Sequence, residues 1–128
     1  MSEIPAELSY TAQHEWVQRT GDDTVRVGIT DFAQDNLGDV VFVQLREVGL
    51  DVEVNGSFSE VESTKSVSDI YAPIAGKVVE VNAELEATPE LLNRDPYGEG
   101  WICVIAAADL SQVDALLDAA AYRALITD

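Results

Sequence analysis

Short hydrophobic segments alternate with turn-forming residues along most of the chain. Residues 14–30 have the sequence HEWVQRTGDDTVRVGIT, in which two runs rich in Val, Ile, Trp and Thr flank a Gly-Asp turn signal. Similar short runs occur at 39–45, 57–63, 66–74, 76–82 and 101–107. Such runs, when turn signals bound them, predict strands. The pattern therefore predicts a mostly β protein, either a sandwich or a small closed barrel.

Two segments in the first hundred residues predict short helices. Thr30 or Asp31 is a suitable N-cap for a helix over 31–37, and a glycine follows where helices commonly end. Thr88 and Pro89 are expected to open a helical turn just ahead of the tight turn signal DPYG.

The C-terminal segment 109–127 has apolar residues at helical spacing, with Asp109 or Ser111 as the expected cap. It predicts one bent helix or two helices that pack against the sheets. No linker or change of composition divides the chain. We therefore expect a single domain over residues 1–128, with this segment as its helical extension.

The net charge of the chain limits the classes of partner that it can bind. It has 24 acidic and 7 basic residues, a formal net charge of -17, which repels nucleic acid and anionic membrane surfaces. We expect docking onto electropositive protein surfaces, and the alternative is a charge that only keeps a monomer soluble. No apolar run approaches the roughly eighteen residues of a membrane span, and the N-terminal residues lack a targeting pattern. A cytoplasmic monomer is predicted.

The residues offer little catalytic chemistry of their own. His14 is the only histidine, and its place before a strand-like run favours a structural role over that of a catalytic base. The motifs GxSxG, GxxxxGK(S/T) and GxGxxG do not occur. Cys103, the only cysteine, lies in the apolar run WICVIAAA, so we expect a buried, inert thiol and no Cys/His metal site. An acidic pair of the glycosidase type remains open, but we expect no independent enzyme activity.

Lys65 is the residue that most needs an explanation. It is one of two lysines, and it stands in the polar run ESTKS between two strand-like segments. A hairpin tip is exposed and accessible to other enzymes. We predict that another enzyme acylates the Lys65 amine, which then carries a swinging cofactor at high local concentration to successive active sites. A solvated turn lysine is the alternative.

Four blocks of the chain resemble the glycine cleavage H-protein family in order and spacing. VESTKSVSDIYAPIAGKVVEVN at 61–82 is similar to the lipoyl-attachment hairpin of that family, and YTAQHEWV, VGITDFAQDNLGDVVFVQL and LLNRDPYGEGWI match its other blocks. The resemblance implies a biotinyl/lipoyl-type hybrid-motif fold, a barrel-sandwich of two small antiparallel sheets with short helices and a C-terminal helix. It also implies a carrier that shuttles the aminomethyl group of glycine on a lipoyl-lysine arm.

The partners that the resemblance implies are enzymes. They are a glycine decarboxylase with pyridoxal phosphate, a folate-dependent aminomethyltransferase, a flavin-containing dihydrolipoyl dehydrogenase and the lipoate-attaching enzymes. A biotin carrier would flank its lysine with methionines, and the sole methionine here is Met1. A lipoyl domain of a 2-oxo acid dehydrogenase would not explain HEWV or DPYGEGW. A relay protein for lipoyl or octanoyl groups, or an unmodified acidic interaction module, remains open.

The resemblance assigns roles around the attachment residue. Lys65 corresponds to the lysine that bears lipoate as an amide. Glu62 and Ser63 correspond to the pair that helps the attaching enzyme recognise the hairpin, although ordinary turn-flanking residues would look the same. Thr64 and Ser66 replace the small aliphatic neighbours that are common in the family. The turn is therefore more polar, and which ligase prefers it is open.

Three further residues are candidates for a cleft that receives the loaded arm. Glu15 corresponds to a family acid whose carboxylate pairs with the ammonium of the aminomethyl group. An exposed glutamate beside Trp16 is the alternative. Ile29 and Asp31, within the match GITD, are the other two candidates.

Overall fold

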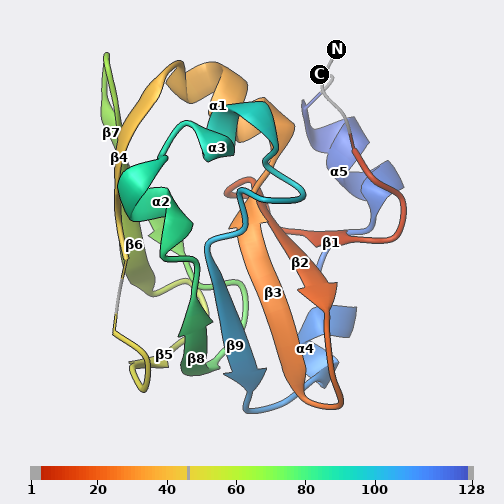
Figure 1. Ribbon diagram of the computed structural model, residues 1–128. Helices are drawn as coiled ribbons and strands as arrows, with labels where there is room; N and C mark the ends of the chain where they lie inside the picture. The colour runs from red at the N-terminus through yellow and green to blue at the C-terminus, as the bar shows by residue number, and fades with distance from the viewer. Residues whose placement is uncertain (1–3, 46, 127–128) are drawn as a thin grey trace.

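Two antiparallel sheets dominate the computed structural model, which describes residues 4–45 and 47–126 (Figure 1). Within these residues the first sheet has the order β1, β2, β3, β9, β8, β5, with the bounds Ser9–Tyr10, Glu15–Arg19, Thr24–Ile29, Cys103–Ala107, Gly76–Val81 and Asp51–Val52. The second sheet has the order β4, β6, β7, with the bounds Val40–Gln44, Ser57–Ser63 and Val67–Tyr71. The predicted mostly β barrel-sandwich of two antiparallel sheets is therefore confirmed.

Strands β2 and β3 form the predicted hairpin and bring two candidate site residues together. Their register places Glu15 opposite Ile29, and each side chain is only 1% exposed. The next pair in the register is Trp16 with Gly28. A Cβ at Gly28 would lie 2.6 Å from the indole ring, so glycine leaves the space that the buried Trp16 occupies.

Helix α1, Asp31–Leu37, begins and ends as predicted. The Thr30 hydroxyl accepts a hydrogen bond from the Ala33 amide at 3.2 Å, which satisfies one of the free N–H groups of the first turn. Gly38 ends the helix with φ +80°, a conformation that disfavours residues with a Cβ. Figure 1 shows α1 at the same end of the molecule as the tip of the β6–β7 hairpin.

A helical turn opens at Thr88 and Pro89 as predicted, with the Leu91 amide donating to the Thr88 carbonyl at 3.1 Å, but a helix before it was not predicted. Helix α2 spans Glu84–Ala87 and helix α3 spans Leu91–Arg94. The Thr88 amide donates to the Glu84 carbonyl at 2.8 Å and ends α2, and the N-cap of α3 is Glu90 instead of the predicted Thr88. The Asn82 side-chain oxygen accepts from the Glu84 amide at 3.3 Å. This contact turns the chain where the hydrophobic pattern alone indicated no helix.

The C-terminal segment forms two helices, α4 at Ser111–Asp114 and α5 at Ala119–Ile126. Residue 127 of the predicted extension lies outside the described residues. Between the helices the Leu117 amide donates to the Tyr10 carbonyl at 2.9 Å, and the Tyr10 amide donates to the Leu117 carbonyl at 2.8 Å. Pairing with β1 occupies backbone groups that a continuous helix would need, so the helix is interrupted.

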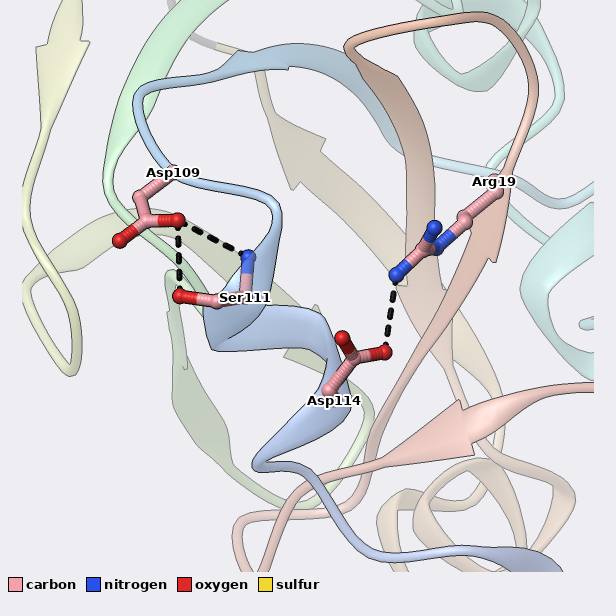
Figure 2. Close-up of polar contacts among 4 residues, drawn as sticks. All are labelled: Arg19, Asp109, Ser111 and Asp114. Carbon is pink, nitrogen blue, oxygen red and sulfur yellow. Dashed lines mark hydrogen bonds and ion pairs between the residues drawn. The ribbon is translucent and has the colours of Figure 1, made fainter.

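The N-cap of α4 is Leu110, which makes no side-chain cap bond, although Asp109, one of the two predicted caps, bonds to the first helical residue (Figure 2). The Asp109 carboxylate accepts hydrogen bonds from the Ser111 amide at 3.0 Å and from its hydroxyl at 2.7 Å. These bonds lower the pKa of Asp109. At the end of the helix Asp114 pairs with Arg19 of β2 at 2.9 Å. Both partners are exposed, so this ion pair contributes little to stability.

Apolar side chains from both sheets fill the space between them. Cys103 of β9 belongs to this core and is 1% exposed, as its apolar run predicted. Burial raises the pKa of its thiol to about 12, so the thiol is protonated and unreactive at neutral pH. The packed core is the rigid base from which the β6–β7 hairpin projects.

Candidate functional site

Lys65 lies in the turn that joins β6 to β7. Glu62 pairs with Val67 in the last rung of the hairpin, and the Ser63 amide donates to the Ser66 carbonyl at 2.8 Å. Lys65 is exposed. In Figure 1 the tip of this hairpin stands clear of the other elements at the upper left. An enzyme can therefore reach the Lys65 amine without opening the fold.

The Ser63 side chain organises the turn. Its Oγ lies 3.3 Å from the Lys65 amide and 3.1 Å from the Ser66 amide, and accepts from both. It also lies 3.2 Å from the Ser66 carbonyl, to which the hydroxyl can donate. These contacts are those of a serine that closes a turn. They give Ser63 a structural role, whether or not an attaching enzyme also contacts it.

Glu62 has a different setting, on the outer face of the three-stranded sheet. Its partners across the sheet are Phe42 of β4 and Val67 of β7. Phe42 is 50% exposed and Val67 is 58% exposed. The rung next to the attachment turn therefore presents a half-buried acid between two apolar side chains. Such a surface suits contact with a protein that approaches Lys65.

A second contact supports the turn from the side of α1. The Thr64 amide donates to the Asp39 carbonyl at 3.0 Å. The stem of Lys65 passes close to Gly38, where an added Cβ would lie 3.4 Å from Lys65 Cε. The turn is therefore joined to the loop between α1 and β4 as well as to its own strands.

A cleft of about 220 Å³ lies next to the attachment turn, between α1 and β7. Apolar side chains in its lining come from β3, α1 and β7, and polar ones come from α1, β7, the attachment turn and the segment before β2. Its lining comprises Gln13, His14, Ile29, Ala33, Asn36, Leu37, Ser66, Ser68, Asp69 and Ile70. Larger hollows of about 590 and 470 Å³ lie elsewhere and contain no residue of the turn. Of these three hollows, the smallest is the one that includes a residue of the turn, Ser66.

The three predicted cleft residues take different positions around this cleft. Ile29 contributes to the lining, whereas Glu15 and Asp31 are not among its described lining residues. The Asp31 carboxylate accepts from Gln34 Nε2 at 2.6 Å, and the Asp31 amide donates to the Tyr97 hydroxyl at 3.0 Å. Asp31 therefore organises the first turn of α1, and its part in receiving an arm stays a prediction.

Glu15 lies buried behind the cleft. Its Oε1 accepts from the Thr11 hydroxyl at 2.6 Å, and its Oε2 accepts from the Tyr71 amide at 3.2 Å. Burial raises the pKa of the carboxyl to about 7, although these two hydrogen bonds oppose the shift. Glu15 thus ties β2 to the end of β7, and close to neutral pH it can hold or release a proton.

His14 has the structural role that the sequence favoured, and it also lines the cleft. Its Nδ1 lies 2.8 Å from the Tyr122 hydroxyl, which lies 2.7 Å from the Thr30 hydroxyl. Burial lowers the pKa of His14, so the ring is neutral at neutral pH. A chain of polar contacts therefore connects α5 with the N-cap of α1 beneath the cleft.

Sequence reasoning missed Gln13 and Asp69 as residues of the cleft. Asp69 lies in β7, four positions after Lys65, and pairs with Glu60. Its closeness to the lysine in the sequence is the only signal that could have identified it. Gln13 lies about fifty positions away, before β2. No local pattern predicts that this segment meets the hairpin, because their contact depends on how the two sheets pack.

Comparisons with known proteins agree with this arrangement. A model of the family described as glycine cleavage H-protein matches residues 8–128. Proteins named glycine cleavage system H protein from Mycolicibacterium smegmatis and Mycobacterium tuberculosis are 63% and 60% identical, and the match covers 100% of this chain and of each relative. A crystal structure of a glycine cleavage system H protein from Mycobacterium marinum superposes with a TM-score of 0.86 at 47% identity, over 94% of this chain and 97% of that chain.

Proposed function

The chain belongs to the glycine cleavage H-protein family, and we propose that Lys65 is the residue that carries its lipoyl group. Members of the family are carriers without catalytic activity of their own, and their cofactor is lipoate attached to a lysine. The observation that carries the assignment to Lys65 is its exposed place in a hairpin turn. The other lysine, Lys77, lies within the paired strand β8. The intact mass of Lys65→Arg tests the assignment.

The residues around Lys65 fit a short acyl chain. The attaching enzyme joins the acyl carbon to Lys65 Nζ, and the amine gives up protons as the activating group leaves. Ile29, Ala33 and Leu37 then offer an apolar wall against which the hydrocarbon part of the arm can rest. The bound lipoyl group supplies a disulfide and dithiol pair that can be reduced, loaded and reoxidised. A group seated in the cleft would be partly sheltered from water.

Glu15, Ile29 and Asp31 remain our candidates for holding the loaded arm. Ile29 supplies part of the apolar wall. Glu15 lies one strand away with a pKa of about 7, which suits a group that exchanges a proton at neutral pH. Asp31 orients Gln34 at the start of α1. Ile29 would thus form part of the wall, Glu15 would hold a proton, and Asp31 would position Gln34.

The protein works with other components of the glycine cleavage system. We propose that these are the decarboxylase with pyridoxal phosphate, the folate-dependent aminomethyltransferase and the flavin-containing dihydrolipoyl dehydrogenase, besides the lipoate-attaching enzymes. We also propose that residues 1–128 act as one monomeric carrier domain in the cytoplasm. Within the described ranges no helix combines the length and the apolarity that crossing a membrane requires.

Binding to the decarboxylase is expected to weaken as salt is added. A net charge of -17 favours a basic partner surface, and attraction between exposed charges is screened by ions. Raising the salt from about 0.01 M to about 0.1 M, which shortens the Debye length from roughly 30 to roughly 10 Å, should raise the dissociation constant severalfold. Calorimetric titration measures this change. A dissociation constant that does not depend on salt would leave the charge without a role in docking.

Glu62→Gln and Ser63→Ala are expected to separate recognition from turn structure. Glu62→Gln removes the charge of this half-buried acid without changing its shape, so we expect about tenfold lower kcat/KM for lipoyl attachment and an unchanged melting temperature. Ser63→Ala removes the oxygen that accepts from the Lys65 and Ser66 amides, so we expect faster hydrogen exchange at both amides. The control is Glu80→Gln, an exposed acid on β8. If Glu80→Gln slows attachment as much as Glu62→Gln does, recognition at Glu62 is excluded.

A further inference from the structure

Asn93 of α3 makes three hydrogen bonds that join α1, the loop after it and the start of β4. Its Nδ2 donates to the Gly38 carbonyl at 2.8 Å and to Gln34 Oε1 at 3.0 Å. Its Oδ1 accepts from the Val40 amide at 2.8 Å. One side chain thus uses both of its donor hydrogens and an acceptor. It holds the peptide groups on the two sides of Asp39.

Asp39 is also the residue that contacts the attachment turn. Its carbonyl accepts from the Thr64 amide at 3.0 Å, next to Lys65. Because Asn93 fixes the flanking Gly38 and Val40, it sets the direction in which the Asp39 carbonyl points. Asn93 therefore supports the turn that holds the lysine indirectly, through the Asp39 carbonyl.

Gly38 of this loop lies beside the lysine stem. An added Cβ would lie 3.4 Å from Lys65 Cε and 4.0 Å from Lys65 Nζ. The preceding residue, Leu37, lines the cleft. The stem therefore lies along the end of α1, where the cleft begins.

We propose that Asn93 is a positioning residue for the acylated lysine, an inference that rests on Lys65 being the attachment residue. Asn93 holds the 38–40 loop, the loop orients the turn through Asp39, and the turn presents the amine in one direction. An attaching enzyme then meets a preorganised target, so less conformational freedom is lost in the chemical step. The hydrogen bonds of the Asn93 side chain go to Gln34, Gly38 and Val40 and not to Glu62 or its partners Phe42 and Val67, so we expect the enzyme to bind the outer face nearly as well without them.

The test compares Asn93→Ala with Asn82→Ala in the full chain. Asn82 is a matched control because its side chain also makes three hydrogen bonds, to the Glu99 and Trp101 carbonyls and from the Glu84 amide. These bonds hold α2 and the segment before β9, not the hairpin. Both substitutions therefore destabilise the fold, but only Asn93→Ala removes the support of the turn.

Two measurements distinguish positioning from stability. In the unmodified protein, the Thr64 amide should exchange its hydrogen about tenfold faster in Asn93→Ala, which corresponds to the loss of one typical hydrogen bond, and at the wild-type rate in Asn82→Ala. With a lipoate-attaching enzyme supplied with lipoate and ATP, Asn93→Ala should lower kcat about tenfold and leave KM nearly unchanged. Asn82→Ala should change neither constant below its melting temperature.

Gly38→Ala provides a second comparison that does not alter Asn93. Gly38 has φ +80° and Gly49 has φ +100°, so alanine strains the backbone at both positions. Gly38 stands beside the Lys65 stem, so backbone strain there acts next to the attachment turn, whereas a Cβ at Gly49 meets nothing within 4 Å. We expect Gly38→Ala to lower the kcat of attachment more than Gly49→Ala does.

The inference is overturned if Asn93→Ala matches Asn82→Ala in both Thr64 exchange and kcat, or if Gly38→Ala and Gly49→Ala behave alike. These outcomes differ from a failure of the proposed function, in which the wild-type protein itself gains no lipoyl group at Lys65. The exchange measurement needs no attached group. It therefore reports on the support of the turn even in that case.

Discussion

We expect Lys65→Arg to gain no lipoyl group when it is produced together with a lipoate-attaching enzyme, whereas the wild-type protein gains one. Arginine keeps the positive charge and a long stem, but its guanidinium does not form the amide that a lysine amine forms. Lys65 is exposed in a turn, so the substitution should leave the melting temperature unchanged. Intact-mass spectrometry measures the result. The effect is all or none, the largest that we predict.

Lys77→Arg is the matched control for this experiment. Lys77 is the other lysine of the chain and is also exposed, but it lies in β8 opposite Ala106 and Asp51. A strand paired on both sides cannot present its backbone to an enzyme as a turn does. Lys77→Arg should therefore be lipoylated like the wild type. Added mass on Lys65→Arg, or its loss from Lys77→Arg, would refute attachment at Lys65.

The second large effect is expected at Glu15, whose burial makes stability depend on pH. The pKa of its carboxyl rises from the ordinary 4.5 to about 7 in the native protein. Between these values the native state holds a proton that the unfolded chain has released, so stability falls as pH rises through this window. At about 1.4 kcal/mol for each unit of pKa, the loss amounts to roughly 3 kcal/mol. This loss of stability is complete once the pH exceeds the native pKa.

Glu15→Gln should remove this loss because the amide stays neutral. The free energy of unfolding of Glu15→Gln relative to wild type should therefore rise by roughly 3 kcal/mol between about pH 5 and about pH 8. Urea denaturation at the two pH values measures it. The lowered pKa of His14 opposes the slope at acid pH, but it acts in both proteins and cancels in the difference.

Glu80→Gln is the control for the effect of removing one negative charge. Glu80 is exposed on β8, so its substitution should shift stability little and without this dependence on pH. Parallel pH profiles for Glu15→Gln and wild type would show that the Glu15 carboxyl ionises as easily in the folded protein as in the unfolded chain. In that case Glu15 would not be the proton-holding group that we propose beside the cleft.

Local patterns predicted much of the fold. The hairpin of β2 and β3, the Thr30 cap of α1 and the glycine after it all depend on residues within a few positions of one another. The pattern did not predict α2, which begins just after Asn82, where the Asn82 side-chain oxygen accepts from the Glu84 amide. It also left the C-terminal segment open between one helix and two. The backbone pairing of Leu117 with Tyr10 interrupts the segment, so it forms two helices.

The sequence by itself determined that the chain forms short strands and that Lys65 stands in a turn between two of them, because alternation and turn chemistry act over a few residues. Only the tertiary structure decided that Glu15 is buried against Tyr71, 56 positions away, and that Asn93 holds Val40, 53 positions away. The cleft beside Lys65 likewise exists only once α1 packs near the hairpin. Burial and long-range hydrogen bonds depend on how the two sheets meet, and this packing leaves no local signature in the order of residues.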